Sequence, residues 1–331
     1  MKKIVGYILL TAVLLSGCTR ACVIPKDITE EEMVAEEVPA EPEDAAEEII
    51  AEKVPAMPED TADEVNDKEE IAKEPEVPKP EPKPEPEPEP EQVKAEIDIN
   101  ALPNDNNGWG FVKKKDSFPE FTKGQKDMMA KYNCIYEGNP AEKVLYLTFD
   151  EGYENGYTGA ILDTLKEKGV PAAFFITGPY LEKNSDLIGR MVAEGHIVGN
   201  HTVNHPNMPS KGTKEAMQEE ILNLDRRFFE LYGRHMSYFR PPEGAYSERS
   251  LAATKEIGYT TVLWSFAYKD WETDNQMGAD YAFESVTPYL HNGCVILLHA
   301  VSKDNTEALG RIIDDARAKG YTFKSLDEFL Y

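Results

Sequence analysis

The sequence predicts an α/β fold built on a parallel β-sheet and preceded by a long segment that does not fold. Two observations lead to this prediction. From residue 143 onward, short apolar runs alternate with longer segments whose apolar residues recur every three or four positions, as in alternating strands and helices. Residues 27–98, in contrast, are rich in Glu and Pro and contain no aromatic residue.

The expected strands are short and apolar, and glycine follows several of the expected helices, which suits a left-handed helix end. Because alternating β and α units imply parallel strands, the sheet is either open or closed into a barrel. We expect strands at 144–149, 172–177, 196–199, 236–239, 260–265, 295–298 and 321–324. We expect helices at 159–168, 185–194, 214–232, 248–257 and 307–319.

Most of the negative charge lies ahead of this pattern. Residues 27–98 hold 28 acidic residues and 6 lysines, a net charge of −22 out of −26 for the whole chain. Such a segment buries too little apolar surface to offset its ordering entropy, and the Pro-Glu repeat at 78–90 favours extended polyproline II. We expect residues 18–98 to form a disordered acidic spacer, with a binding tail for basic partners as the alternative. The overall charge therefore does not indicate the substrate, and nothing favours a nucleic acid partner.

The first residues resemble a bacterial lipoprotein signal. Lys2 and Lys3 precede an apolar stretch at 4–15, and residues 15–18 read Leu-Ser-Gly-Cys. The resemblance predicts that residues 1–17 are removed and that Cys18 carries the lipid, so the protein is held at the membrane and faces the wall. A plain secretory signal is the alternative. Both place the mature protein outside the cytoplasm.

Between the spacer and the alternating region, residues 99–142 are expected to form an arm that packs on the main domain, with a short helix at 123–132. Cys294 precedes an apolar run and is expected in the core. A disulfide with Cys134 is conceivable outside the cell, and no cysteine has metal-finger spacing.

Polar and charged residues follow five of the expected strands. In α/β barrels the active site forms from loops at the carboxyl ends of the strands. Taken singly, these residues could belong to acidic turns, structural ion pairs or surface loops, but their recurrence at five strand ends favours catalysis. They are Asp150-Glu151, Asn200-His201, Arg240 to Glu243, Lys269 to Trp271 and His299.

Two histidines in this group suggest a metal. His201 and His205 are four residues apart, so on a helical turn ended by Pro206 they would share a face and bind one ion. With a carboxylate from another strand end, the set suits Zn²⁺, with Mn²⁺, Co²⁺ or Fe²⁺ also possible. Such a site leaves room for water and substrate.

A hydrolase also needs a base and an acid. We expect Asp150 to be the base and His299 the acid. Asp270 could keep His299 protonated, because an adjacent carboxylate favours imidazolium. Arg240 could orient Asp150 through a bidentate pair.

These motifs resemble the polysaccharide deacetylase family, the NodB-type carbohydrate esterases of family 4. The resemblance covers residues 143–331 and implies a distorted (β/α) barrel of about seven parallel strands that removes N-acetyl groups from an amino sugar with the help of a metal. The matching motifs are Thr148-Phe-Asp-Glu151, His201-Thr-Val-Asn-His205, Arg240-Pro-Pro242, Ala267-Tyr-Lys-Asp270-Trp271 and Leu297-Leu-His299.

The resemblance also implies further roles. The backbone N–H of Glu243 would stabilise the oxyanion. Glu151 replaces the family's metal-binding aspartate and would be the third ligand beside His201 and His205, while Ala267 replaces another acid of the pattern. The residues expected to bind substrate are Pro241, Trp271 and Leu297.

Within the family, the chain is most similar to the muramic δ-lactam de-N-acetylases, in which the acid at position 151 is itself often replaced. The shared stretches include 152–157, 199–206 and 298–305. The resemblance implies de-N-acetylation of N-acetylmuramic acid whose peptide has been removed, followed by lactam closure. The alternatives are deacetylation of N-acetylglucosamine in a wall or chitin-like polymer, and a non-catalytic wall-binding lipoprotein. We expect peptidoglycan as the partner, a monomer, and no organic cofactor.

Overall fold

The structure is a computed structural model that describes residues 97–329. The predicted signal peptide, Cys18 and nearly all of the predicted spacer lie outside the described residues.

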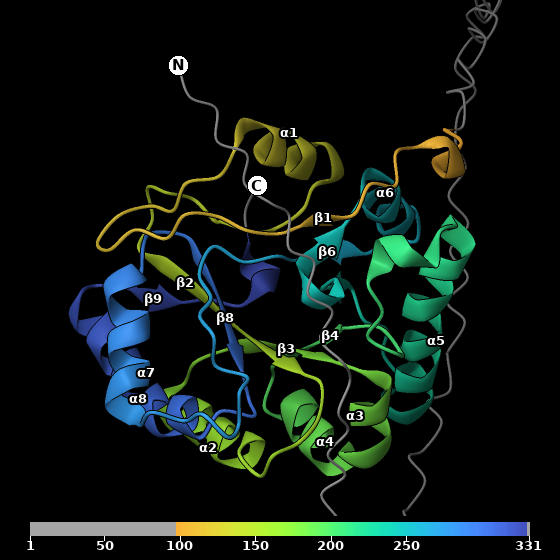
Figure 1. Cartoon of the computed structure of the whole chain (residues 1–331). Helices are drawn as coiled ribbons and strands as arrows, with labels where there is room; N and C mark the ends of the chain where they lie inside the picture. The colour runs from red at the N-terminus through yellow and green to blue at the C-terminus, as the bar shows by residue number, and fades with distance from the viewer. Residues whose placement is uncertain (1–96, 330–331) are drawn as a thin grey trace, which may run out of the picture. The chain divides into compact units, whose positions relative to one another are not determined.

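Seven parallel strands form the central sheet, in the order β7-β5-β4-β3-β2-β8, with β9 also paired to β2 (Figure 1). In the segment that follows β7, Phe266 forms a parallel bridge with Ile296 of β8. This link joins the two ends of the strand order, so the predicted distorted (β/α) barrel is confirmed. The strands are β2 (Val144–Glu151), β3 (Ala172–Ile176), β4 (Ile197–Asn200), β5 (Tyr238–Phe239), β7 (Thr260–Thr261), β8 (Cys294–His299) and β9 (Thr322–Phe323).

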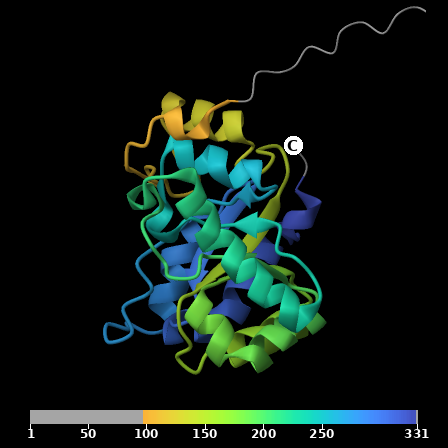
Figure 2. The ribbon, with the colours of Figure 1, turned by 90° about the vertical axis from the view of Figure 1, so that its right-hand side faces the viewer.

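Helices surround this sheet, and Figure 2 shows α5 crossing one side of the barrel. The five predicted helices are present, but α3 and α7 were missed because each is too short to display a clear period of 3.6 residues. The α-helices of the barrel are α2 (Thr158–Lys168), α3 (Gly178–Lys183), α4 (Ser185–Ala193), α5 (Lys214–Tyr232), α6 (Glu248–Glu256), α7 (Ala279–Val286) and α8 (Lys303–Ala318). The 3₁₀ helices are η1 (Ile99–Ala101), η2 (Met208–Lys211), η3 (Pro242–Gly244), η4 (Thr287–Tyr289) and η5 (Leu326–Glu328).

The eight residues of β2 are all buried, and alternate side chains point to opposite faces of the strand. Leu147 and Phe149 pack in the large core that includes residues of the surrounding helices. Tyr146 belongs to a second apolar cluster, with Phe175 of β3, that fills the barrel interior. This alternation places Asp150 on the inner face of the strand and Glu151 on the outer face.

The arm before residue 143 packs against the barrel. Its strand β1 (Asn107–Gly108) pairs antiparallel with β6 (Ala245–Tyr246), and α1 (Lys123–Tyr132) begins with a capping box. The indole N–H of Trp109 donates to the backbone carbonyl of Trp264 over 2.8 Å. The arm therefore supports the strand segment that carries Trp264.

Cys134 and Cys294 are both free and buried, and Cys294 lies in the core as predicted. Burial raises the pKa of each thiol to about 12, so both remain protonated. In residues 97–329, no helix is both long enough and apolar enough to cross a membrane.

Candidate active site

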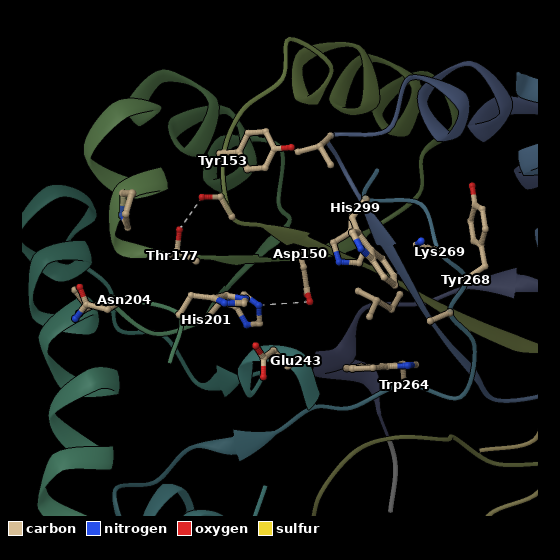
Figure 3. A pocket seen from close by; sticks show the side chains of 18 residues that line it. Asp150, Tyr153, Thr177, His201, Asn204, Glu243, Trp264, Tyr268, Lys269 and His299 are labelled. Atoms are coloured by element: carbon tan, nitrogen blue, oxygen red, sulfur yellow. Dashed lines mark hydrogen bonds and ion pairs between the residues drawn. The ribbon is translucent and has the colours of Figure 1, made fainter. Parts of the chain in front are cut away.

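A cavity of about 860 Å³ opens at the carboxyl ends of the strands, and it brings together most of the predicted site residues (Figure 3). Arg240 and Asp270 lie behind the cavity wall, where each contacts a lining residue. Glu151 and Pro241 are buried but do not line the cavity. The predicted residues that do line it are Asp150, His201, His205, Glu243, Trp271, Leu297 and His299.

Asp150, at the end of β2, lies between His201 and His299 (Figure 3). One of its carboxylate oxygens accepts a hydrogen bond from Arg240 over 2.8 Å, and the other lies 3.6 Å from His201 Nε2. Burial alone would raise the pKa of Asp150, but the charge and hydrogen bond of Arg240, together with the charge of His299, hold it below its usual range. Asp150 is therefore ionised, as a base must be.

Arg240, after β5, orients Asp150 through a single contact rather than the predicted bidentate pair. Its other terminal nitrogen donates to Thr148 Oγ1 over 2.8 Å, and its guanidinium stacks 4.2 Å from the ring centre of Phe175. Nε donates to the carbonyl of Val262. The guanidinium group of Arg240 can bind Thr148 and Asp150 together because both side chains point inward from β2. One arginine therefore holds the end of this strand in place.

His299 is the last residue of β8. Its Nδ1 and its backbone N–H both bind the carboxylate of Asp270, over 2.7 and 2.8 Å. Asn305 donates to the same carboxylate. Burial opposes the imidazolium, but Asp270 outweighs that effect and raises the pKa of His299. With Nδ1 held by Asp270, Nε2 is the nitrogen left to give a proton.

The segment that carries His201 and His205 is not a helical turn, so this part of the prediction was wrong. It is a loop after β4 in which Thr202 and His205 have positive φ values of 71° and 54°. The two imidazole rings are nevertheless neighbours, with centroids 4.9 Å apart. The loop, rather than helical spacing, brings them together.

Neighbouring elements hold this loop. Glu220 of α5 accepts hydrogen bonds from the backbone and side chain of Asn204, and its carbonyl accepts from Val203. On the other side, the N–H of Gly178 donates to Val203. A Cβ atom on Gly178 would lie 2.6 Å from the Val203 oxygen, so glycine is required for this close approach.

Glu151 is completely buried on the outer face of β2, and neither of its carboxylate oxygens has a hydrogen-bond partner. Burial, and then the charges of Glu154 and Asp150, raise the pKa of Glu151 well above its usual range. The structure does not bring Glu151 to the histidines. Strand alternation decides this, because consecutive residues of β2 face opposite sides.

His201 and His205 are suited to binding a metal ion, but Glu151 does not join them as the predicted third ligand. His201 Nδ1 lies 2.8 Å from the carbonyl of Arg240, and burial lowers the pKa of His201 to about 4. A neutral ring whose Nδ1–H is engaged leaves Nε2 free, which is the form that ligating histidines take. Residues 97–329 contain no group of three or more His, Cys, Asp or Glu that could hold a metal ion.

Glu243 lies in η3 with left-handed backbone angles, φ 59° and ψ 4°. Its side chain points into the cavity below His201 (Figure 3). Left-handed φ is uncommon outside glycine, and such strained residues cluster at active sites. This conformation agrees with the predicted use of the Glu243 backbone N–H as an oxyanion donor, whereas Pro241 is buried and does not line the cavity.

Several cavity residues were not singled out from the sequence. Trp264 and Tyr268 lie in the segment after β7, and Tyr153 follows Gly152. Lys269, which belongs to the predicted strand-end group at 269–271, also lines the cavity. Tyr153 is 54% exposed and Trp271 48%, which is high for large rings and typical of surfaces that stack on a ligand. For Tyr153 the available signal was its position in the segment directly after a strand end.

Comparisons agree with this geometry. The model of the polysaccharide deacetylase family matches residues 137–262. Bacillus subtilis PdaA, a peptidoglycan-N-acetylmuramic acid deacetylase, is 42% identical over 233 residues, which cover 70% of this chain and 88% of PdaA. This chain belongs to the polysaccharide deacetylase family.

A solved structure of PdaA, described as a family 4 carbohydrate esterase, matches this deacetylase with a TM-score of 0.67 at 43% identity and covers 69% of this chain and 98% of that one. A peptidoglycan-N-acetylglucosamine deacetylase of Bacillus cereus is 33% identical over 196 residues, which cover 57% of this chain and 89% of the relative. The predicted class, a hydrolase of an N-acetyl amide bond, is confirmed. Deacetylases of this family are generally dependent on a divalent metal.

Proposed function

We propose that this deacetylase hydrolyses the N-acetyl group of N-acetylmuramic acid in peptidoglycan strands whose peptides have been removed, which leads to the muramic δ-lactam. The observation that supports it is the pairing of an ionised Asp150 with a His299 whose pKa is raised, both facing one cavity. A carboxylate whose pKa is lowered beside an imidazole whose pKa is raised is what an acid–base hydrolysis needs.

In this reaction Asp150 takes a proton from a water molecule as the water oxygen bonds to the acetyl carbon. The carbonyl oxygen becomes an oxyanion, which the backbone N–H of Glu243 stabilises. His299 then donates its Nε2 proton to the sugar nitrogen while the carbon–nitrogen bond breaks. The products are the free amine and acetic acid, which ionises to acetate. Asp150 then releases to solvent the proton that it took, and His299 regains a proton from solvent.

His201 and His205 would hold the divalent ion, and zinc fits two imidazoles with open positions best. When bound, such an ion polarises the acetyl carbonyl and lowers the pKa of water. That contribution matters because a carboxylate with a lowered pKa, such as Asp150, is by itself a weak base. Elemental analysis of the purified protein and of His201→Ala tests the assignment, and an unchanged metal content in the variant contradicts it.

The activity test measures acetate release from peptidoglycan with and without prior amidase treatment, and with and without a chelator. We expect release only after the amidase has removed the peptides, and loss of release with the chelator. Release from untreated wall or from chitin-like oligomers would instead select N-acetylglucosamine, the substrate named for the relative from Bacillus cereus.

The third possibility is a wall-binding protein without turnover, suggested by the altered positions Glu151 and Ala267. It predicts binding to peptidoglycan but no acetate release by the metal-loaded protein from any glycan. The acid–base pair in the cavity argues for turnover, because binding alone does not require Asp150 and His299 in these protonation states.

We also propose an extracytoplasmic location with a lipid on Cys18 and residues 18–98 as a spacer between the membrane and the catalytic domain at 143–331. The proposal rests on the sequence of residues 1–18 and on relatives that act on peptidoglycan. Fractionation of cells that carry Cys18→Ala tests it. Retention of the variant in the membrane fraction would exclude the lipid anchor. Light scattering of the purified domain tests the expected monomer.

A further inference from the structure

Lys269 is the cationic side chain of the cavity that the acid–base chemistry does not use. Among the cavity-lining residues within 97–329 it is the sole lysine or arginine, since Arg240 is fully buried behind the wall. Figure 3 shows it on the His299 side of the cavity, near Tyr268. It follows Tyr268 in the chain and precedes Asp270, the residue that holds His299.

In this structure Lys269 forms an ion pair with Glu272, three residues further along. The pair is exposed, with 60% of the lysine side chain and 36% of the glutamate side chain accessible to solvent. Exposed pairs of this kind contribute little to stability, so a ligand carboxylate can replace Glu272 as the partner at small cost.

The proposed substrate requires such a cation. Stripped N-acetylmuramic acid carries a free carboxylate on the lactyl ether of the ring carbon next to the one that bears the acetamide. This carboxylate can close a lactam on the nitrogen after deacetylation, so it reaches the nitrogen that His299 protonates. It must therefore lie on the His299 side of the cavity.

Two acidic side chains of the cavity are unfavourable to that charge. The ionised Asp150 and the side chain of Glu243 both line the cavity, and like charges repel more strongly where the dielectric constant is low. A peptide-bearing muramic acid has an amide in place of the carboxylate and would gain nothing from a cation. A positive charge near His299 would thus select the stripped sugar.

We propose that Lys269 binds the lactyl carboxylate of the muramic acid residue and so determines the preference for peptide-free strands. This inference rests on the proposed function. Lys269 acts in binding and not in the chemical step, so its effect belongs in KM rather than kcat.

The test compares amidase-stripped glycan strands with the same strands after methyl esterification, which removes the carboxylate charge and adds a methyl group. In Lys269→Met we expect KM for the stripped strands to rise about tenfold, the loss of one charge-assisted hydrogen bond, with kcat unchanged. The ester should give wild type and variant the same KM. Lys269→Arg should keep most of the affinity, and Glu272→Gln should lower KM because Lys269 then has no competing carboxylate.

The matched control is Lys123→Met, which removes a lysine paired with Asp127 on α1, away from the cavity, and should change neither constant. An unchanged KM for stripped strands in Lys269→Met, or an equal rise on the ester, would overturn the role of Lys269 while leaving the deacetylase assignment intact. Absence of acetate release by wild type from any strand would instead refute the proposed function.

Discussion

Replacing Asp270 by asparagine should move the alkaline limit of deacetylation to lower pH. His299 must be protonated to give its proton to the leaving nitrogen, so activity is present below its pKa and is lost above it. Asp270 raises that pKa. Without the carboxylate charge, His299 loses its proton at a lower pH, and the active range narrows from the alkaline side.

The structure sets the size of the shift. The Asp270 carboxylate is 2.7 Å from His299 Nδ1, and Asp270 is only 3% exposed, so solvent screens the interaction weakly. A hydrogen bond to a charged group contributes about 1.5–3 kcal/mol, and one pKa unit corresponds to about 1.4 kcal/mol. We therefore expect the alkaline limb of the kcat/KM profile to move to lower pH by about one to two pH units.

The assay measures kcat/KM for acetate release across pH for wild type, Asp270→Asn and a matched control. Asp225→Asn is suitable, because Asp225 is also buried and lies 2.7 Å from the Nδ1 of His235, outside the cavity. The control variant should show the alkaline limb of kcat/KM at the same pH as wild type. An unchanged limb in Asp270→Asn, with the variant folded, would refute His299 as the acid whose pKa Asp270 raises.

Three further outcomes follow from the site and the barrel. Asp150→Asn should abolish acetate release yet leave metal content near that of wild type, and loss of the metal would make Asp150 a ligand instead of the base. Folding raises the pKa of Glu151. Its contribution to stability is therefore fully present below the pKa of the unfolded state and is lost as the pH rises towards the pKa of the folded state. Between pH 5 and pH 8 the Tm of Glu151→Gln should consequently fall less than that of wild type. A Cβ atom on Gly199 would lie 2.6 Å from the Phe175 ring, so Gly199→Ala should lower the free energy of unfolding by about 1–3 kcal/mol, and an unchanged denaturant midpoint would contradict the packing.

The order of strands and helices could be predicted from the sequence because each element carries its own period. The helix α1 has the predicted bounds, and each of the seven expected strands overlaps a strand of the sheet. The boundaries of β5 and β7 were too long, since only two residues of each pair regularly. After Thr261 the chain leaves the regular ladder and Trp264 joins the cavity wall, which local apolar character does not reveal.

The sequence by itself determined which residue types arrive at the strand ends, among them Asp150, His201 and His299, because strand periodicity and order along the chain are local properties. Only the tertiary structure decided how their neighbours are used. It separates Glu151 from Asp150 by the alternation of β2, and brings the two histidines together on a loop. It also places Lys269 at the cavity, through contacts between segments far apart in the chain. Direction and proximity of this kind depend on packing across the barrel, and no local pattern encodes them.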